Sequence, residues 1–177
     1  MTNRSIEHLL RDHREIESVL DELEALLNSQ KAEPRWTANH ALAFAWVTRC
    51  FNESVMHHIR KEEENLFPAL EEFLPRDDSP LDEWRREQAD LRAQLQRMRD
   101  AGAALSAGDE HPQFAEDFQR SGRALLRLLR NHIDKQDRIL FPRVARLLSP
   151  ERDAEILQQL EALAPQKAAR MPPASRD

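Results

Sequence analysis

The chain has 177 residues, a length that fits a single domain. Charged residues make up 33% of it and the formal net charge is −6, so no general attraction to nucleic acid is expected. Its three glycines are too few for the turns of sandwiches, barrels and doubly wound folds. The single cysteine, Cys50, excludes an internal disulfide and fits a reducing compartment.

The apolar runs and the start of the chain predict a soluble, cytoplasmic protein. The longest purely apolar run, 41–47, has seven residues, against the roughly 20 that span a bilayer. Arg4, Glu7, Arg11 and Asp12 stand where a signal peptide would need an apolar stretch. We therefore expect no membrane partner.

Between the prolines, apolar residues recur at three- and four-residue spacing, which predicts helices. The first helix is expected from about residue 4 to 28. A loop with Pro34 follows, and the second helix is expected over about 36–73. Pro68 lies late in this second helix and should kink or thin it, because proline lacks an N–H donor.

The second half of the chain is organised in the same way. A serine cap at Ser79 and the proline after it predict the start of a third helix, which extends to about residue 105. A loop over 108–112 leads into a fourth helix with an apolar stripe over 114–139. A second serine–proline pair, at 149–150, opens a short fifth helix.

These elements predict an all-α fold. Four long amphipathic helices with short connections form an up-down-up-down four-helix bundle, and the short fifth C-terminal helix packs across one end. The bundle domain is expected to cover residues 1–164. The tail, 165–177, has few apolar residues and two adjacent prolines, so we expect it to be disordered.

One internal repeat relates the second helix to the fourth. It consists of HIRKEEENLFP at 58–68 and HIDKQDRILFP at 132–142. The two segments are identical at six of eleven positions, with a constant offset of 74 residues. The first two helices and the next two therefore look like duplicated units.

Polar residues interrupt the apolar stripe of each long helix. The first polar residue of each stripe lies eight to ten residues from the proline or cap that marks one end of the bundle, a depth of about 12–15 Å at the rise of an α-helix. Residues four apart share a helix face, so a second polar residue joins the layer twice. The side chains expected to converge are His13, His58, Glu62, Gln88, His132 and Gln136.

Burying imidazoles and a carboxylate costs several kcal/mol unless they are paired or bind a metal ion. Helix bundles build metal sites from ligands that project inward from facing helices. We therefore predict that this layer binds a metal. The alternative is a core in which the polar groups satisfy one another by hydrogen bonds.

Several other residues are not expected in this layer. His8 is expected to be exposed, and His57 to lie at the surface or behind the site. His40 and His111 fall near the opposite end of the bundle. A solvated face paired with acids is predicted for four arginines at helical spacing, Arg120, Arg123, Arg127 and Arg130.

The pattern resembles the hemerythrin-like, or HHE cation-binding, family. The resemblance rests on the segment LLRDH at 9–13, on the two His-x-x-x-(Glu/Gln)-x-x-x-Leu-Phe-Pro segments and on the four-helix spacing. It covers roughly residues 4–148. It implies two non-haem irons in the bundle core, and a role in binding O₂, in sensing O₂ or NO, or in handling iron or peroxide.

The ligand pattern that the resemblance implies is only partly present. It consists of one His from the first helix, His and Glu from the second, His from the third, and His and Glu from the fourth. Gln88 and Gln136 stand at two of these positions, and glutamine is a neutral, weak ligand for iron. Asp137 stands where some family members have a bridging aspartate. The candidate metal ligands are His13, His58, Glu62, His132 and Asp137.

The resemblance also assigns one iron to the first two helices and the other to the last two. The first site keeps His13, His58 and Glu62, a two-histidine, one-carboxylate set that suits Fe(II) with open positions. We therefore predict an asymmetric site with one ion, which His132 or Asp137 helps to hold. Reversible O₂ carriage, which needs both irons, is not expected.

Two alternatives stay open. In the first, the chain is a metal-free, degenerate scaffold that acts through protein contacts, since Gln88 and Gln136 can hydrogen-bond His132 and Glu62. In the second it is an oxidoreductase that consumes peroxide or NO, although no further catalytic residue is identified and we expect a binding protein rather than an enzyme. The expected cofactor is one or two non-haem iron ions, or none. The expected partners are O₂ or NO and, in addition, a second copy or another protein, but not nucleic acid.

Overall fold

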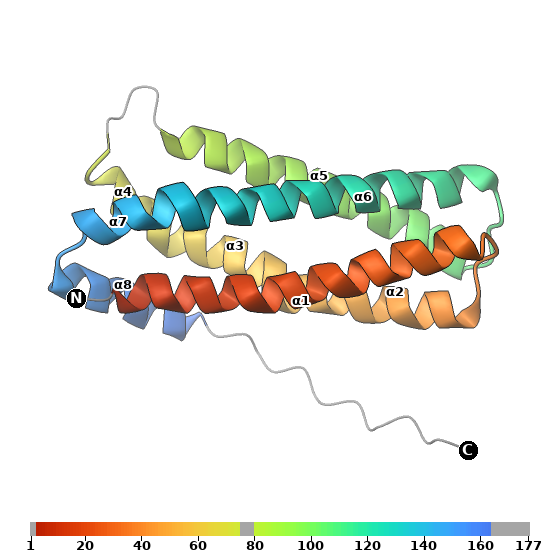
Figure 1. Cartoon of the computed structure of the whole chain (residues 1–177), viewed down its shortest axis with the longest axis horizontal. Helices are drawn as coiled ribbons and strands as arrows, with labels where there is room; N and C mark the ends of the chain where they lie inside the picture. The colour runs from red at the N-terminus through yellow and green to blue at the C-terminus, as the bar shows by residue number, and fades with distance from the viewer. Residues whose placement is uncertain (1–2, 75–79, 164–177) are drawn as a thin grey trace, which may run out of the picture.

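The computed structural model describes residues 3–74 and 80–163. The long helical rods lie side by side, with a short helix beside the start of the first (Figure 1). The first rod is α1 (Arg4–Ala32), and the third is α5 (Pro80–Ser106). The second rod comprises α2 (Ala38–Cys50), η1 (Phe51–Met56), α3 (His57–Lys61), η2 (Glu62–Leu66) and α4 (Phe67–Glu71). The fourth rod comprises α6 (Pro112–Lys135), η3 (Gln136–Leu140) and α7 (Phe141–Leu147), and the short helix is α8 (Pro150–Ala162).

This arrangement confirms the predicted all-α bundle with a short C-terminal helix. Because α1 and α5 each pack against both the second rod and the fourth, the rods surround one core. α1 extends past Asn28 to Ala32, since Gln30 is still buried and accepts a hydrogen bond from Gln119 of α6. The predicted cap at Ser79 and the tail 165–177 lie outside the described residues. Within the described ranges, no helix has the length and apolar character that would let it cross a membrane.

A π-helical turn precedes each proline inside the long rods. η2 lies directly before Phe67 and Pro68, and the N–H of Phe67 donates to the carbonyl of Glu62. η3 repeats this geometry before Phe141, whose N–H donates to the carbonyl of Gln136. The wider turn relieves the contact between a proline ring and the preceding helical turn. The disturbance expected at Pro68 therefore takes the form of a π turn, and the rod continues through it.

The apolar core consists of two clusters separated along the bundle. The larger cluster, which includes Phe51 and Phe118, fills the half that contains the α1–α2 and α5–α6 connections. The smaller cluster, which includes Phe67 and Phe141, fills the end closed by α8. Every rod places buried polar side chains between these two clusters. The clusters therefore shield one polar layer from both ends of the bundle.

α8 closes its end of the bundle by capping α1. Asp153 Oδ2 accepts a hydrogen bond from the Arg4 N–H at 2.8 Å, and Oδ1 accepts one from the Ser5 N–H at 3.1 Å. A carboxylate at a helix N-terminus satisfies N–H groups that have no partner within the helix. Ile156 packs into the smaller cluster, so the placement of α1, and of His13 on it, depends on α8.

Candidate metal centre

Six buried polar side chains meet between the two apolar clusters. None of them is more than 3% exposed. They are His13 from α1, His58 from α3, Glu62 from η2, Gln88 from α5, His132 from α6 and Gln136 from η3. The structure thus brings together all six polar positions that the apolar stripes single out, and the π turns η2 and η3 each begin with one of them.

Glu62 lies at the centre of this layer, and each of its oxygens faces one glutamine and one histidine. Oε1 accepts a hydrogen bond from Gln136 Nε2 at 2.5 Å and lies 3.6 Å from His58 Nε2. Oε2 accepts one from Gln88 Nε2 at 2.7 Å and lies 3.8 Å from His132 Nε2. The carboxylate of Glu62 therefore spans both halves of the layer.

The Nε2 atoms of His13 and His58 face each other. Their Nε2 atoms are 3.0 Å apart, and their rings meet edge to face with centroids 4.7 Å apart. Two ligands about 2.1 Å from one metal ion and at right angles to each other are about 3.0 Å apart. The pair therefore has a separation that suits two ligands of one ion. Without an ion, a single proton shared between the nitrogens explains the contact.

Each histidine of the layer uses its outer nitrogen, Nδ1, to donate to a carboxylate. A carboxylate can only accept, so Nδ1 carries the proton and Nε2 points into the layer. The three pairs are His13 with Asp137 at 2.6 Å, His58 with Asp12 at 3.2 Å and His132 with Glu87 at 3.0 Å. This is the arrangement in which an outer acid orients a metal-binding imidazole.

Asp137 lies on the outer side of His13, with 38% of its side chain exposed. The candidate ligand Asp137 therefore contacts the outer nitrogen of His13 and not the Nε2 side of the ring. Sequence reasoning missed the roles of Asp12 and Glu87. A signal was present, because each acid directly precedes the inward residue of its helix, as Asp12-His13 and Glu87-Gln88.

The charges of the layer shift the pKa values of its members. Burial would lower the pKa of His58, but the negative charges of Glu62 and Asp12 outweigh burial and raise that pKa to about 9. Burial would raise the pKa of Glu62, yet His58 and His132 hold it well below its usual range. The pKa of His132 is likewise raised against burial, by Glu62 and Glu87. In the absence of metal, an ionised Glu62 therefore lies beside a protonated imidazole at neutral pH.

The fit to a metal ion can be judged from polar atoms left unpaired. Among the described residues, three buried atoms of the layer have no hydrogen-bond partner: His132 Nε2, Gln88 Oε1 and Gln136 Oε1. All three are potential metal ligands. In the described part of the chain, however, no group of three His, Cys, Asp or Glu side chains is arranged to hold an ion as it stands. Both oxygens of Glu62 are held instead by the amides of Gln88 and Gln136.

A cleft of about 500 Å³ between α1 and the fourth rod reaches the layer. His13 and Asp137 are among its lining residues, so the cleft gives solvent access to the Asp137 side of His13. Phe141 stacks on the His13 ring with centroids 5.2 Å apart. The apolar side chains of the two Leu-Phe-Pro segments are all buried in the smaller cluster: Leu66, Phe67, Leu140 and Phe141.

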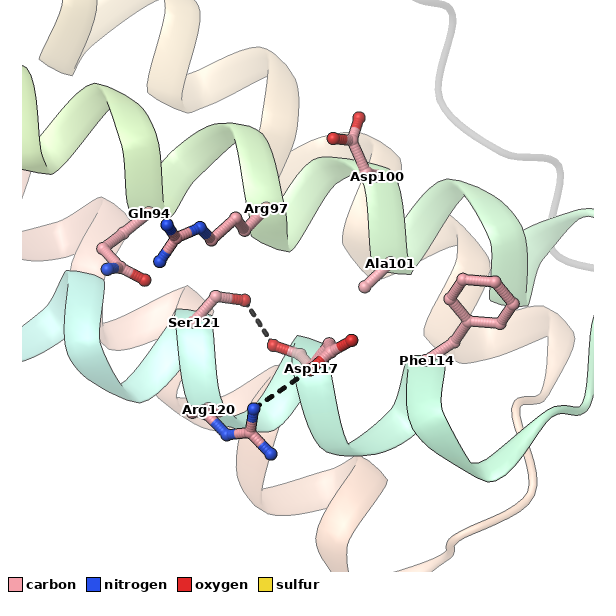
Figure 2. A pocket seen from close by; sticks show the side chains of 8 residues that line it. All are labelled: Gln94, Arg97, Asp100, Ala101, Phe114, Asp117, Arg120 and Ser121. Atoms are coloured by element: carbon pink, nitrogen blue, oxygen red, sulfur yellow. Dashed lines mark hydrogen bonds and ion pairs between the residues drawn. The ribbon is translucent and has the colours of Figure 1, made fainter.

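A second hollow, of about 440 Å³, lies between α5 and α6 and contains none of the layer's residues (Figure 2). Arg97 and Arg120 line it together with Asp100 and Asp117, so the lining contains equal numbers of basic and acidic residues. Arg120 pairs with Asp117 at 3.3 Å. Arg130, farther along α6, pairs with three acids of α1. Arg120, Arg123 and Arg130 thus belong to a solvated face paired with acids, as the helical spacing predicts.

Inward histidines around a carboxylate, each with an acid behind it, are the kind of arrangement from which helical bundles build metal sites. The family model that matches the chain is the hemerythrin HHE cation binding domain, over residues 4–144. The chain belongs to this family. No curated protein and no solved structure matches it.

Proposed function

We propose that the chain is an iron-binding protein with an asymmetric, mononuclear site. His13, His58 and Glu62 would hold the ion. The observation that carries this proposal is the 3.0 Å separation of two Nε2 atoms whose rings are both fixed from behind by an acid. Two histidines and one carboxylate suit Fe(II) with open positions, and the family is named for cation binding.

The other half of the layer supports weaker binding. It offers His132 Nε2 and one oxygen of Glu62, together with the neutral amides of Gln88 and Gln136. Each amide donates its N–H group toward Glu62 and must rotate to present its oxygen. We therefore propose that this half contributes His132 to the layer but does not hold a second iron with comparable affinity.

A bound ferrous ion would supply a redox-active centre with a free position for O₂, NO or peroxide. The chain's own residues prepare that position. Asp12 and Asp137 keep the protons at Nδ1 of His58 and His13, so both Nε2 atoms are available inside the layer. The two apolar clusters exclude water from the ends, and the cleft beside Asp137 stops at the outer side of His13. The proposed role is therefore to sense or handle O₂, NO, peroxide or iron.

This proposal predicts that the Fe(II)-loaded protein binds NO in proportion to its iron. The protein is reconstituted anaerobically, titrated with NO and followed by absorption and electron paramagnetic resonance. The signal should saturate when NO equals iron. Iron that stays bound while NO leaves the spectra unchanged would contradict an open position on the metal.

A metal-free scaffold is the second candidate, and one observation favours it. Both glutamine amides donate to Glu62, and His13 contacts His58, so most of the layer is satisfied without an ion. A scaffold would fold fully in the presence of a chelator, and Fe(II) would not raise its melting temperature. Binding of Fe(II) to the native state alone would raise it, because a ligand selective for the native state stabilises that state.

A further inference from the structure

The internal repeat contains a lysine that the proposed metal site does not explain. Lys61 and Lys135 occupy equivalent positions of the two repeat segments, each three residues after a histidine of the layer. Lys61 Nζ donates to Asp12 Oδ2 at 2.8 Å, the same oxygen that His58 contacts. Each half of the bundle therefore contains a hydrogen-bonded series of three side chains: a layer histidine, an acid and a lysine.

The hydrogen-bonded series in the other half has the same order of side chains but a different environment. Lys135 Nζ donates to Glu87, and Glu87 accepts from His132 Nδ1 at 3.0 Å. The Lys135 side chain is 41% exposed, whereas the Lys61 side chain is only 6% exposed. The ammonium of Lys61 is thus enclosed beside the half of the layer that keeps the stronger ligand set.

Lys61 also connects the site with the surface. Its Nζ lies 2.9 Å from His8 Nε2, which must accept this hydrogen bond because an ammonium has no acceptor atom. The expected exposure of His8 is only partly met, since 17% of its side chain is accessible. Asp137, the acid behind His13, differs from Asp12 and Glu87 because no lysine pairs with it. In the described part of the chain, Asp137 has no cation other than His13 within ion-pair distance.

We propose that Lys61 is a positioning residue for His58. This inference rests on the proposed function, because it assigns Lys61 a role toward a metal ligand. Lys61 and His58 donate to one oxygen of Asp12, so the ammonium fixes the carboxylate at the point where it receives the Nδ1–H of His58. With that proton fixed, the imidazole presents Nε2 toward His13 and cannot rotate or change tautomer freely.

The charge of Asp12 supports this role. Asp12 Oδ2 accepts hydrogen bonds both from His58 Nδ1 and from Lys61 Nζ, and a carboxylate offers acceptor atoms only. Because Lys61 shares that acceptor, we expect Asp12 to hold the His58 proton without removing it. A merely structural ion pair would stabilise the bundle but would leave the ring of His58 as it is.

The test compares Lys61→Met with Lys61→Arg. The matched control is Lys135→Met, in the more exposed hydrogen-bonded series. In metal-free protein with ¹⁵N-labelled histidine, nuclear magnetic resonance gives the exchange rate of the His58 Nδ1–H with water. We expect Lys61→Met to raise this rate about tenfold or more, the effect of losing one charged hydrogen bond. Lys61→Arg and Lys135→Met should leave it close to that of the wild type.

A second readout uses Co(II) as the probe metal. Lys61→Met should weaken Co(II) binding about 10- to 100-fold, as loss of an outer partner does in other metal sites, and should alter the ligand-field spectrum. Lys61→Arg should restore both. The double variant Asp12→Asn/Lys61→Met, which leaves no buried charge behind, controls for instability. An unchanged His58 exchange rate in a folded Lys61→Met protein would overturn the inference, whereas a wild-type chain that binds neither Co(II) nor Fe(II) would overturn the proposed function alone.

Discussion

Restoring the two missing ligands should convert the asymmetric layer into a site for two irons. Gln136 donates to Glu62 Oε1 at 2.5 Å, so Gln136→Glu removes a hydrogen bond to a charged group and places a second carboxyl beside the first. The lost bond alone is worth about 1.5–3 kcal/mol. The free energy of unfolding of the metal-free Gln88→His/Gln136→Glu protein should therefore be about 2 kcal/mol or more below that of the wild type.

Iron should reverse this loss. A ligand at 100 times its Kd stabilises the native state by about 2.7 kcal/mol, which offsets the deficit. The assay combines urea unfolding, with and without Fe(II), and elemental analysis of bound iron. The double variant should bind close to two irons per chain, and the exposed-site control Gln96→His/Gln159→Glu should bind as wild type does. A folded double variant that binds no more iron than wild type would refute the placement of the second half-site.

Three further predictions concern charge and capping. Because the pKa of His58 rises from 6.5 to about 9 on folding, His58 should stabilise the folded state by about 3 kcal/mol below pH 6.5, and this stabilisation should be lost as the pH rises through 9. Urea unfolding of the metal-free protein at several pH values should show the loss. A His58→Asn protein whose free energy of unfolding has the same pH dependence would contradict this prediction. Asp153→Ala should lower the free energy of unfolding by about 1–2 kcal/mol by removing the cap of α1, whereas Glu155→Ala should change it by less than about 0.5 kcal/mol. Asp137→Ala should weaken Fe(II) binding about 10-fold, whereas Asp137→Asn, which keeps an acceptor for His13, should lose little affinity; equal losses in a titration would mean that the carboxylate charge itself is required.

The polar layer could be predicted because its position depends only on counting along helices. Prolines and caps mark one end of each rod, and the rise per residue converts sequence distance into depth. His13, His58, Gln88 and His132 therefore had to lie at similar depth once the helices were antiparallel. The structure places them together, between two apolar clusters.

The features that sequence reasoning missed depend on distances between helices and on local helix geometry. Nothing in the repeat alone shows that Lys61 is buried, because its partner Asp12 comes from another rod. The π turn that begins at Gln136 changes the angular positions of the residues after it, so the direction of Asp137 does not follow from its spacing to His132 alone. The repeat nevertheless carried a usable signal, since lysine is one of its identical positions.

The hydrogen bonds within the layer also could not be derived from residue types. Gln88 and Gln136 were compatible both with weak metal ligation and with a satisfied polar core. In the structure their amides donate to Glu62, which shows how the layer is held without metal. Their carbonyl oxygens and His132 Nε2 are buried without a hydrogen-bond partner in the described ranges, which is the feature that a cation would relieve.

Iron stoichiometry tests the central claim most directly. Untagged protein is reconstituted anaerobically with Fe(II), freed of excess metal and analysed for iron, together with His58→Ala and the adjacent-residue control His57→Ala. We predict one iron per chain in wild type and in His57→Ala, and none in His58→Ala. Two irons in wild type, or iron retained by His58→Ala, would contradict a single site built on His13, His58 and Glu62, and a folded wild-type chain without iron would favour the scaffold.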